Sequence, residues 1–384
     1  MSKSRKNKKN KRLGIILVLE VVVFIGLILG YAWYFVNHTL DQIPTDEVKK
    51  EEIDVSAAVT ETMKEKYMSI ALFGVDTRDE VDLTKEGAAR SDAIIIASIN
   101  NETKEVKLVS VYRDCFVEMM KDEVPSTLKA TEVYYYGGPA IALETLNRNL
   151  DMNIQNYVTV DFKALTNAID ALGGVTINVK ESEINNLNNN LQEQIGATGI
   201  QSEGVWEAGE QVLNGSQATA YARIRKVGNN DFERTQRQRA VITAMIDQAK
   251  KSDLQTITNV INEVFSQIAT NLTKKELLSL AAGMFEYELT ENTGFPLSHQ
   301  TPDLGSKGSV VVPANLLSNV EYLHEFLFPE DTDYIPSAEV QQISTNIMNE
   351  TGIGDEFTDD KKTEEPTATN AGDSTEEMTT VSPY

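Results

Sequence analysis

A long apolar stretch near the N-terminus is the feature that most constrains this chain. Residues 13–36 are almost entirely apolar, and residues 1–12 before them carry seven basic side chains. A helix needs about 20 apolar residues to cross a bilayer, and Tyr31, Trp33 and Tyr34 are typical of the membrane interface. Because basic residues stay on the cytoplasmic side, we predict a cytoplasmic tail, one transmembrane helix and an extracellular remainder.

The alternative for this segment is a cleaved signal peptide. Signal peptides have an apolar region of about 7–15 residues, closely followed by a small-x-small cleavage site. The stretch at residues 13–36 is longer, and no such site follows it closely. We therefore favour an uncleaved signal anchor in a cell membrane.

Charge and cysteine content bear on partners and on stability. The formal net charge is -23. Because this sum includes the basic N-terminal tail, the remainder of the chain is more negative than the total indicates. We expect no nucleic acid partner, because nucleic acid binding requires a basic surface. Cys115 is the only cysteine, so the external part has no intramolecular disulfide and must be held together by its core.

Composition divides the part after the anchor into three regions. Residues 37–66 are polar and predict an extracellular stalk. Residues 67–345 contain the apolar runs of one main domain. Residues 346–384 are acidic, rich in Thr and poor in large apolar side chains, so we predict a disordered tail.

Hydrophobic periodicity predicts an α/β fold for the main domain. Short apolar runs typical of buried strands occur at residues 69–73, 93–99, 106–111, 157–160, 175–179 and 310–312. Helical spacing occurs at residues 139–150, 162–172, 181–194, 215–221, 232–250, 254–268 and 273–285. The Asn-rich stretch 181–194 is interpreted as a surface helix or an ordered insertion. The alternation of strands and helices favours a layered sheet.

Charged residues gather in three short clusters at predicted strand ends. They are Asp76 with Arg78, Arg90 with Asp92, and Arg113 with Asp114. In open α/β sheets the crevice at strand ends binds ligands, so charged residues there are well placed for function. The structural alternatives are that Asp76 stabilises a turn and that Arg90 and Asp92 form a surface ion pair.

A fourth cluster lies later in the chain. Arg223 and Arg225 share a face if the backbone between them is extended. Asp231, Arg234 and Gln238 are spaced by three and then four residues, which places them on one face of a helix. The guanidinium fork suits phosphate oxygens, and paired aspartates suit Mg²⁺. Together the clusters predict a pyrophosphate site beside a divalent metal. The alternative for Arg234, Arg237 and Arg239 is a solvated helix face.

Other catalytic chemistry has little support. The three histidines, His38, His299 and His324, lie outside every cluster in the sequence, which argues against a Ser-His-Asp triad or a His-ligated zinc site. Cys115 follows Arg113 and Asp114, but without a nearby histidine we interpret it as a small semi-buried residue.

In sequence, these clusters resemble the LytR-CpsA-Psr family of membrane-anchored cell-wall ligases. The matching segments are residues 72–78, 90–92, 110–114, 137–138, 170–175 and 218–225, followed by Asp231, Arg234 and Gln238. Their order over residues 69–240 makes the resemblance specific. This chain differs at Tyr112 and Cys115, where the family often has Pro and Thr, and at Thr131-Glu132, where it usually has Asn-Ala. These differences bear on acceptor choice and pocket shape.

The resemblance implies a fold and a set of site residues. The fold would be a mixed central β-sheet flanked by helices, with an apolar tunnel for a polyprenyl tail. Asp76 and Asp92 would bind Mg²⁺ or Mn²⁺. The pyrophosphate would be bound by Arg78, Arg90, Arg113, Arg223, Arg225, Arg234 and Gln238. Arg113, Asp92 and Asp231 would be catalytic, and the general base stays open among Asp76, Asp92 and Asp231.

The resemblance also implies a reaction. A glycopolymer would be transferred from an undecaprenyl-pyrophosphate carrier to peptidoglycan, through a phosphodiester bond, on the outer surface of a Gram-positive-type membrane. The alternatives are a polyprenyl-pyrophosphate hydrolase, in which water replaces the sugar hydroxyl, and a non-enzymatic, membrane-bound lipid-binding regulator of cell-envelope genes.

Overall fold

A computed structural model describes residues 48–354 and the pair 367–368, with gaps at 78–80, 226, 228–229 and at scattered positions between 254 and 284. The predicted transmembrane helix, Arg78 and the side chain of Asp231 lie outside the described residues. Among the described residues, none of the helices is both long enough and apolar enough to span a membrane. The chain divides into units of residues 1–43 and 44–384, and the description below concerns the second.

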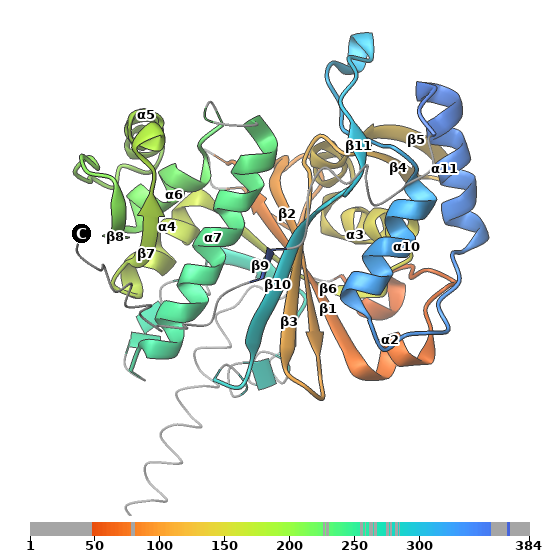
Figure 1. The fold of residues 1–384 in the computed structure, drawn as a ribbon, viewed down its shortest axis with the longest axis horizontal. Helices are drawn as coiled ribbons and strands as arrows, with labels where there is room; N and C mark the ends of the chain where they lie inside the picture. The colour runs from red at the N-terminus through yellow and green to blue at the C-terminus, as the bar shows by residue number, and fades with distance from the viewer. Residues whose placement is uncertain are drawn as a thin grey trace, which may run out of the picture. The chain divides into compact units, whose positions relative to one another are not determined.

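The second unit is built around a mixed central sheet, as predicted. Its strand order is β13 (Thr367–Ala368), β10 (Glu288–Phe295), β3 (Glu105–Val111), β2 (Ser91–Asn100), β1 (Tyr67–Val75), β6 (Ile154–Asp161), β9 (Ile268–Thr270). The pairs β1–β6 and β3–β10 are parallel, and the other neighbours are antiparallel. Figure 1 shows these strands running through the middle of the unit.

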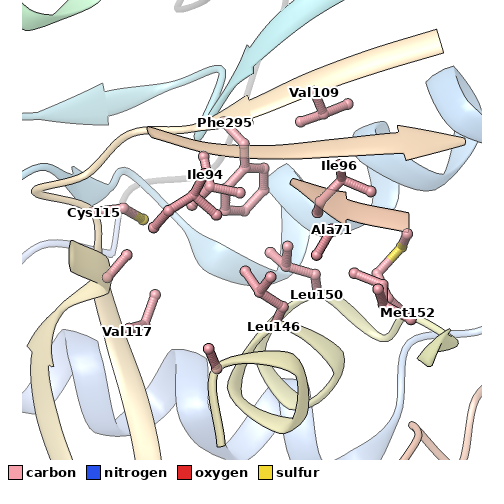
Figure 2. Close-up of a cluster of buried hydrophobic side chains, with 14 of the residues drawn as sticks. Ala71, Ile94, Ile96, Val109, Cys115, Val117, Leu146, Leu150, Met152 and Phe295 are labelled. Carbon is pink, nitrogen blue, oxygen red and sulfur yellow. The ribbon is translucent and has the colours of Figure 1, made fainter. Parts of the chain in front are cut away.

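Helices cover both faces of this sheet (Figure 1). On one side lie α3 (Ala130–Leu150), α10 (Leu316–Leu327) and α11 (Ala338–Thr351), and on the other lies α7 (Asn230–Lys251). Side chains alternate between the two faces along a strand, and β2 follows this rule. Ile94 and Ile96 enter the main core with Leu146 of α3 (Figure 2), whereas Ile95 enters the core on the α7 side.

A second, smaller core lies beside α7 (Figure 1). It contains α4 (Phe162–Ala171), β7 (Val175–Val179), α5 (Glu181–Thr198), β8 (Gly209–Leu213) and α6 (Gly215–Ala222). The predicted helix end at Gly173 and Gly174 is confirmed, with positive φ angles of 84° and 95°. The predicted strand at residues 175–179 is also confirmed, but β7 pairs with β8 outside the central sheet.

Several elements were not predicted. They are the hairpin of β4 (Phe116–Lys121) and β5 (Val124–Lys129), the strands β8, β9, β10 and β13, the helices α10 and α11, α2 (Glu61–Lys66), and the short pieces η1 (Lys50–Glu52), β11 (His299–Gln300) and η3 (Gly305–Lys307). The predicted strand at 310–312 is reduced to β12 (Val312–Pro313), and the predicted helix at 254–268 is too long because Ile268 begins β9.

Two predicted domain boundaries are wrong. The stalk was predicted over residues 37–66, but Ile53 and Met63 are 5% and 2% exposed and belong to the main core. Lys50 also pairs with Glu276 at 2.5 Å. The tail was predicted from residue 346, but α11 continues to Thr351 and Ile347 is 2% exposed against the core. Apolar contacts made by a few residues in polar segments decide both boundaries.

Candidate functional site

The three early charged clusters meet at one edge of the sheet. β1 and β2 are antiparallel and Val75 pairs with Ser91, so the end of β1 lies beside the start of β2. β3 is antiparallel to β2 and ends at the same edge, where Val111 pairs with Ile94. Asp76, Asp92 and Arg113 therefore come together although up to 37 residues separate them in the chain.

A cavity of about 370 Å³ lies at this edge and extends to the second core. We call it the first cavity. Seven predicted site residues line it: Asp76, Asp92, Arg113, Arg223, Arg225, Arg234 and Gln238. Four guanidinium groups thus surround one cavity in a chain whose net charge is -23. This local excess of positive charge suits an anionic ligand with several oxygens.

Two arginines hold the carboxylate of Asp92. Arg113 Nη1 donates to Asp92 Oδ1, and Arg225 Nη2 lies 3.4 Å from Asp92 Oδ2. Arg113 Nε also lies 3.7 Å from Asp114 Oδ1, which in turn is 3.3 Å from Lys129 Nζ. The side chains of Arg113 and Asp92 are only 20% and 21% exposed, so the guanidinium is fixed in orientation at the cavity wall.

Arg223 and Arg225 reach the first cavity together because the chain leaves α6 between them. Arg223 is the C-cap of α6, and the intervening Ile224 is fully buried in the second core. Gln194 Oε1 accepts from Arg223 Nη1 at 3.3 Å, and the ring of Phe162 lies 4.9 Å from the guanidinium carbon of Arg223. Both arginines line the first cavity, but the extended backbone on which their shared face was predicted to depend is not found at Arg223, whose φ of −94° and ψ of −2° are helical.

The arginines of α7 have three different surroundings, and the solvated-face alternative is wrong for all of them. Arg234 is 2% exposed and lines the first cavity with Gln238, one turn further on. Arg237 pairs with the buried Glu183 of α5 at 2.7 Å. Arg239 donates to the Thr293 carbonyl at 3.0 Å, and burial lowers its pKa to about 10. Gln238 Oε1 is buried and accepts no hydrogen bond from the described residues.

The Asn-rich helix α5 supplies site residues that the sequence did not reveal. Its polar face brings Asn186, Asn189, Asn190 and Glu193 to the first cavity. Their spacing of three to four residues is the helical repeat, and the opposite face, with Leu187 and Leu191, is buried. The amphipathic pattern predicted the helix, but only the tertiary fold shows that its polar face meets a cavity rather than solvent.

A second cavity, of about 640 Å³, adjoins the first. It is lined by Asp76, Ala89, Arg90, Asp92, Tyr135 and Tyr136. Arg90 therefore faces this second cavity, and its Nη2 lies 3.3 Å from Glu132 Oε1. The predicted surface pair of Arg90 with Asp92 is replaced by this pair with Glu132, because Asp92 is already engaged by Arg113 and Arg225.

Asp76 and Asp92 offer the oxygen donors of a divalent metal site, though not a complete set of ligands. Among the described residues, no group of three or more His, Cys, Asp or Glu side chains could hold a metal ion. Asp76 and Asp92 nevertheless line both cavities and offer carboxylate oxygens. Mg²⁺ typically takes one or two protein carboxylates, with phosphate oxygens and water as its other ligands. Two carboxylates next to a cluster of arginines fit that pattern.

The cysteine and the two histidines that the structure describes contribute no reactive group to the cavities. Cys115 is fully buried, and burial raises the pKa of its thiol. Desolvation lowers the pKa of His299, which stacks on Phe232, and lowers that of His324 to about 4. Neither histidine lines the two cavities described above.

Known proteins match this chain in sequence. The polyisoprenyl-teichoic acid–peptidoglycan teichoic acid transferase TagV of Bacillus subtilis is 28% identical over 272 residues, which cover 70% of this chain and 66% of TagV. The corresponding transferase TagU of Bacillus licheniformis is 26% identical over 291 residues, covering 74% of this chain and 86% of TagU.

Solved structures match the fold. The crystal structure of B. subtilis TagV has a TM-score of 0.53 at 27% identity and covers 71% of this chain and 100% of that chain. Protein gbs0355 from Streptococcus agalactiae has a TM-score of 0.59 at 24% identity, covers 74% of this chain and 95% of that chain, and shows the fold alone. The family model described as the LytR_cpsA_psr family matches residues 31–293. This chain therefore belongs to the LytR-CpsA-Psr family.

Proposed function

We propose that the chain is an extracytoplasmic phosphotransferase that moves a glycopolymer phosphate from a polyprenyl-pyrophosphate carrier to a hydroxyl of peptidoglycan. The observation that carries this proposal is the first cavity, in which four arginines surround two aspartates in an otherwise acidic chain. The names of TagV and TagU describe the transfer of teichoic acid from a polyisoprenyl carrier to peptidoglycan, and this supports the same reaction class here.

Along one face of α7 the side chains change from polar to apolar, as binding of an amphiphilic donor would require. Arg234, Gln238, Ile242 and Ile246 follow one another at intervals of four residues and form one stripe along the helix. The first two line the first cavity, and the last two pack, partly buried, beside Ile95 and Leu108 of the sheet. A pyrophosphate at the polar end and a polyprenyl tail along the apolar end would match this stripe.

The reaction moves one phosphoryl group. The acceptor oxygen forms a bond to the phosphorus that carries the glycan, the bridging bond to the second phosphorus breaks, and polyprenyl phosphate leaves. The acceptor proton leaves the hydroxyl, and Asp76, Asp92 and Asp231 are the candidate bases. Phosphoryl transfer depends on positioning and on neutralising charge at phosphate oxygens, which Arg113, Arg223 and Arg225 would supply.

We propose that Asp76 and Asp92 hold Mg²⁺ or Mn²⁺. A bound divalent ion would neutralise charge on the pyrophosphate and orient its oxygens. Arg113 and Arg225 contact the two oxygens of Asp92 and thereby hold its carboxylate at the wall that the two cavities share. Arg78, whose structure is not described, and Arg90, at the second cavity, remain proposed contacts of the substrate.

Turnover of a defined donor separates this proposal from its alternatives. The full chain in detergent, with Mg²⁺ and a polyprenyl-pyrophosphate glycan, should form glycan-phosphate-peptidoglycan when peptidoglycan fragments are added. Release of free glycan phosphate at the same rate with and without acceptor would identify a hydrolase instead. Donor binding without any turnover would favour a lipid-binding regulator.

A further inference from the structure

We propose that the second cavity binds the acceptor, a peptidoglycan sugar, with Tyr135 and Tyr136 as its stacking surface. This inference rests on the proposed function and deepens it. Of the described residues, Asp76 and Asp92 alone line both the first and the second cavity. A donor phosphate in the first cavity and a hydroxyl in the second would therefore meet at these two carboxylates, from different sides.

The two tyrosines differ sharply from their neighbour in the same helix. Tyr134 is fully buried in the main core, and its hydroxyl lies 2.9 Å from Thr159 Oγ1. Tyr135 and Tyr136 are 41% and 44% exposed, with ring centroids 5.4 Å apart in an edge-to-face arrangement. Exposed aromatic rings beside a cavity offer apolar area to a ligand, and the C–H face of a sugar ring suits such a surface.

A kink in α3 fixes the backbone that carries these rings. Gly138 has φ 65° and ψ −166°, and the next residue, Pro139, has no N–H for the Tyr135 carbonyl. The Gly87 N–H donates to that carbonyl instead, at 2.7 Å, and Lys121 Nζ donates to the Tyr136 carbonyl at 2.6 Å. The loop before β2 and the β4–β5 hairpin therefore hydrogen-bond to the main-chain carbonyls of Tyr135 and Tyr136, and these bonds fix the backbone of the aromatic pair.

The remaining lining argues for a neutral polar ligand. Among the lining residues that the structure describes, Arg90 is the one cation of the second cavity, and it is paired with Glu132, in contrast to the four guanidinium groups of the first cavity. In the described lining, Ala89 is the one aliphatic residue, and such a lining does not suit a lipid tail. A guanidinium and two carboxylates are hydrogen-bonding partners for the hydroxyl and amide groups of an N-acetylated sugar, while the two phenol rings supply the stacking surface.

The test compares acceptor and donor parameters in a double variant. Y135A/Y136A in the full chain should raise the acceptor KM about tenfold, which corresponds to the loss of two aromatic contacts. Y135F/Y136F keeps both rings and should stay within about twofold of the parent. Donor affinity should be unchanged in both variants. Trp206→Ala is the matched control, because Trp206 is 78% exposed and does not line this cavity.

A direct measurement of acceptor binding tests the acceptor site without relying on transfer activity. A soluble disaccharide-peptide fragment of peptidoglycan is titrated against the parent and Y135A/Y136A, and the tyrosine ring signals are followed by NMR. Weaker binding to the variant supports the acceptor site even if no transfer is detected, in which case the proposed function fails alone. Equal binding and an unchanged acceptor KM, in a chain that performs transfer, would overturn the inference and leave the function standing.

Discussion

At the scale of single residues, the ion pair of Arg113 with Asp92 connects the fold to the chemistry. Arg113 follows β3 and Asp92 lies in β2, and the antiparallel register of these strands places them side by side. Arg225 contacts the other oxygen of the same carboxylate. The planar guanidinium of Arg113 presents several N–H donors in a fixed fork, so it can contact Asp92 and a second anion at the same time. The ammonium group of a lysine has no such fixed fork.

Arg113→Lys should therefore lower kcat/KM about 100-fold although the charge is kept, because the fork that orients Asp92 and the phosphate is lost. Steady-state transfer kinetics with the lipid donor measure this. Arg148→Lys is the control, since Arg148 pairs with Glu118 and Glu339 and does not line the first cavity. Equal activity of the Arg113 and Arg148 variants would contradict the role assigned to Arg113.

His324 gives a prediction for pH. It is 3% exposed, its Nε2 donates to the Leu150 carbonyl at 2.8 Å, and burial lowers its pKa from 6.5 to about 4. The unfolded chain therefore binds a proton before the folded chain does, so the stability present above pH 6.5 is lost between pH 6.5 and 4. Between pH 7 and 5 we expect a loss on the order of 2 kcal/mol from this group.

His324→Gln should remove that contribution, because glutamine does not titrate and can still donate to the Leu150 carbonyl. Urea unfolding at pH 7 and pH 5 gives the loss of unfolding free energy for the parent and for the variant. The difference between the two losses belongs to His324, because the carboxylates contribute equally to both proteins. A parent that loses no more stability than the variant would show that His324 is not held neutral by the fold.

At the scale of elements, the position of α5 explains what sequence reasoning achieved and missed. The apolar spacing of Ile184, Leu187 and Leu191 predicted the helix correctly, since one face had to be buried. Whether its polar face meets water or a cavity depends on α7, to which Glu183 is tied through Arg237. The strand β10 was missed for a related reason. Its polar residues Glu288, Glu291 and Asn292 do not show the apolar run of a central strand, and pairing with β3 identifies it.

The asparagines of α5 should contribute to recognition of the donor glycan. N186A/N189A is expected to raise the KM for a glycan-bearing donor about fivefold, because each lost hydrogen bond contributes about 0.5–1.5 kcal/mol. Binding of polyprenyl pyrophosphate without glycan should not change. Asn185→Ala is the matched control, since Asn185 is exposed on the same helix and does not line the first cavity. Equal loss of binding for both ligands would contradict a glycan contact.

At the scale of the whole molecule, the order of the charged motifs predicted which distant side chains line the first cavity better than any single motif did. Asp76, Asp92 and Arg113 came from the rule that ligands bind at strand ends, and the sheet topology brings them together as that rule requires. The rule does not distinguish two adjoining cavities, so the placement of Arg90 with Tyr135 and Tyr136 required the fold. Domain boundaries failed where isolated apolar residues, such as Ile53 and Met63, pack from polar segments.

The predicted anchor should matter only when the donor lies in a bilayer. Removing residues 1–36 is expected to lower transfer from vesicle-embedded donor by at least about tenfold, because the anchor raises the local concentration of enzyme at the membrane. Turnover of donor dispersed in detergent should change less than twofold. An unrelated apolar helix in place of residues 13–36 should restore activity on vesicles. Equal loss on both forms of donor would argue that this segment acts on the fold of the domain instead.

The lipid product tests the central claim most directly. Attack of a peptidoglycan hydroxyl on the phosphorus bearing the glycan leaves polyprenyl monophosphate, whereas attack on the sugar carbon leaves polyprenyl pyrophosphate. Mass spectrometry of the lipid fraction from a reaction with acceptor and Mg²⁺ distinguishes the two. We predict polyprenyl monophosphate in equal amount to a phosphodiester-linked glycan-peptidoglycan product. Polyprenyl pyrophosphate as the lipid product, or monophosphate formed without any glycan-peptidoglycan adduct, would contradict the account.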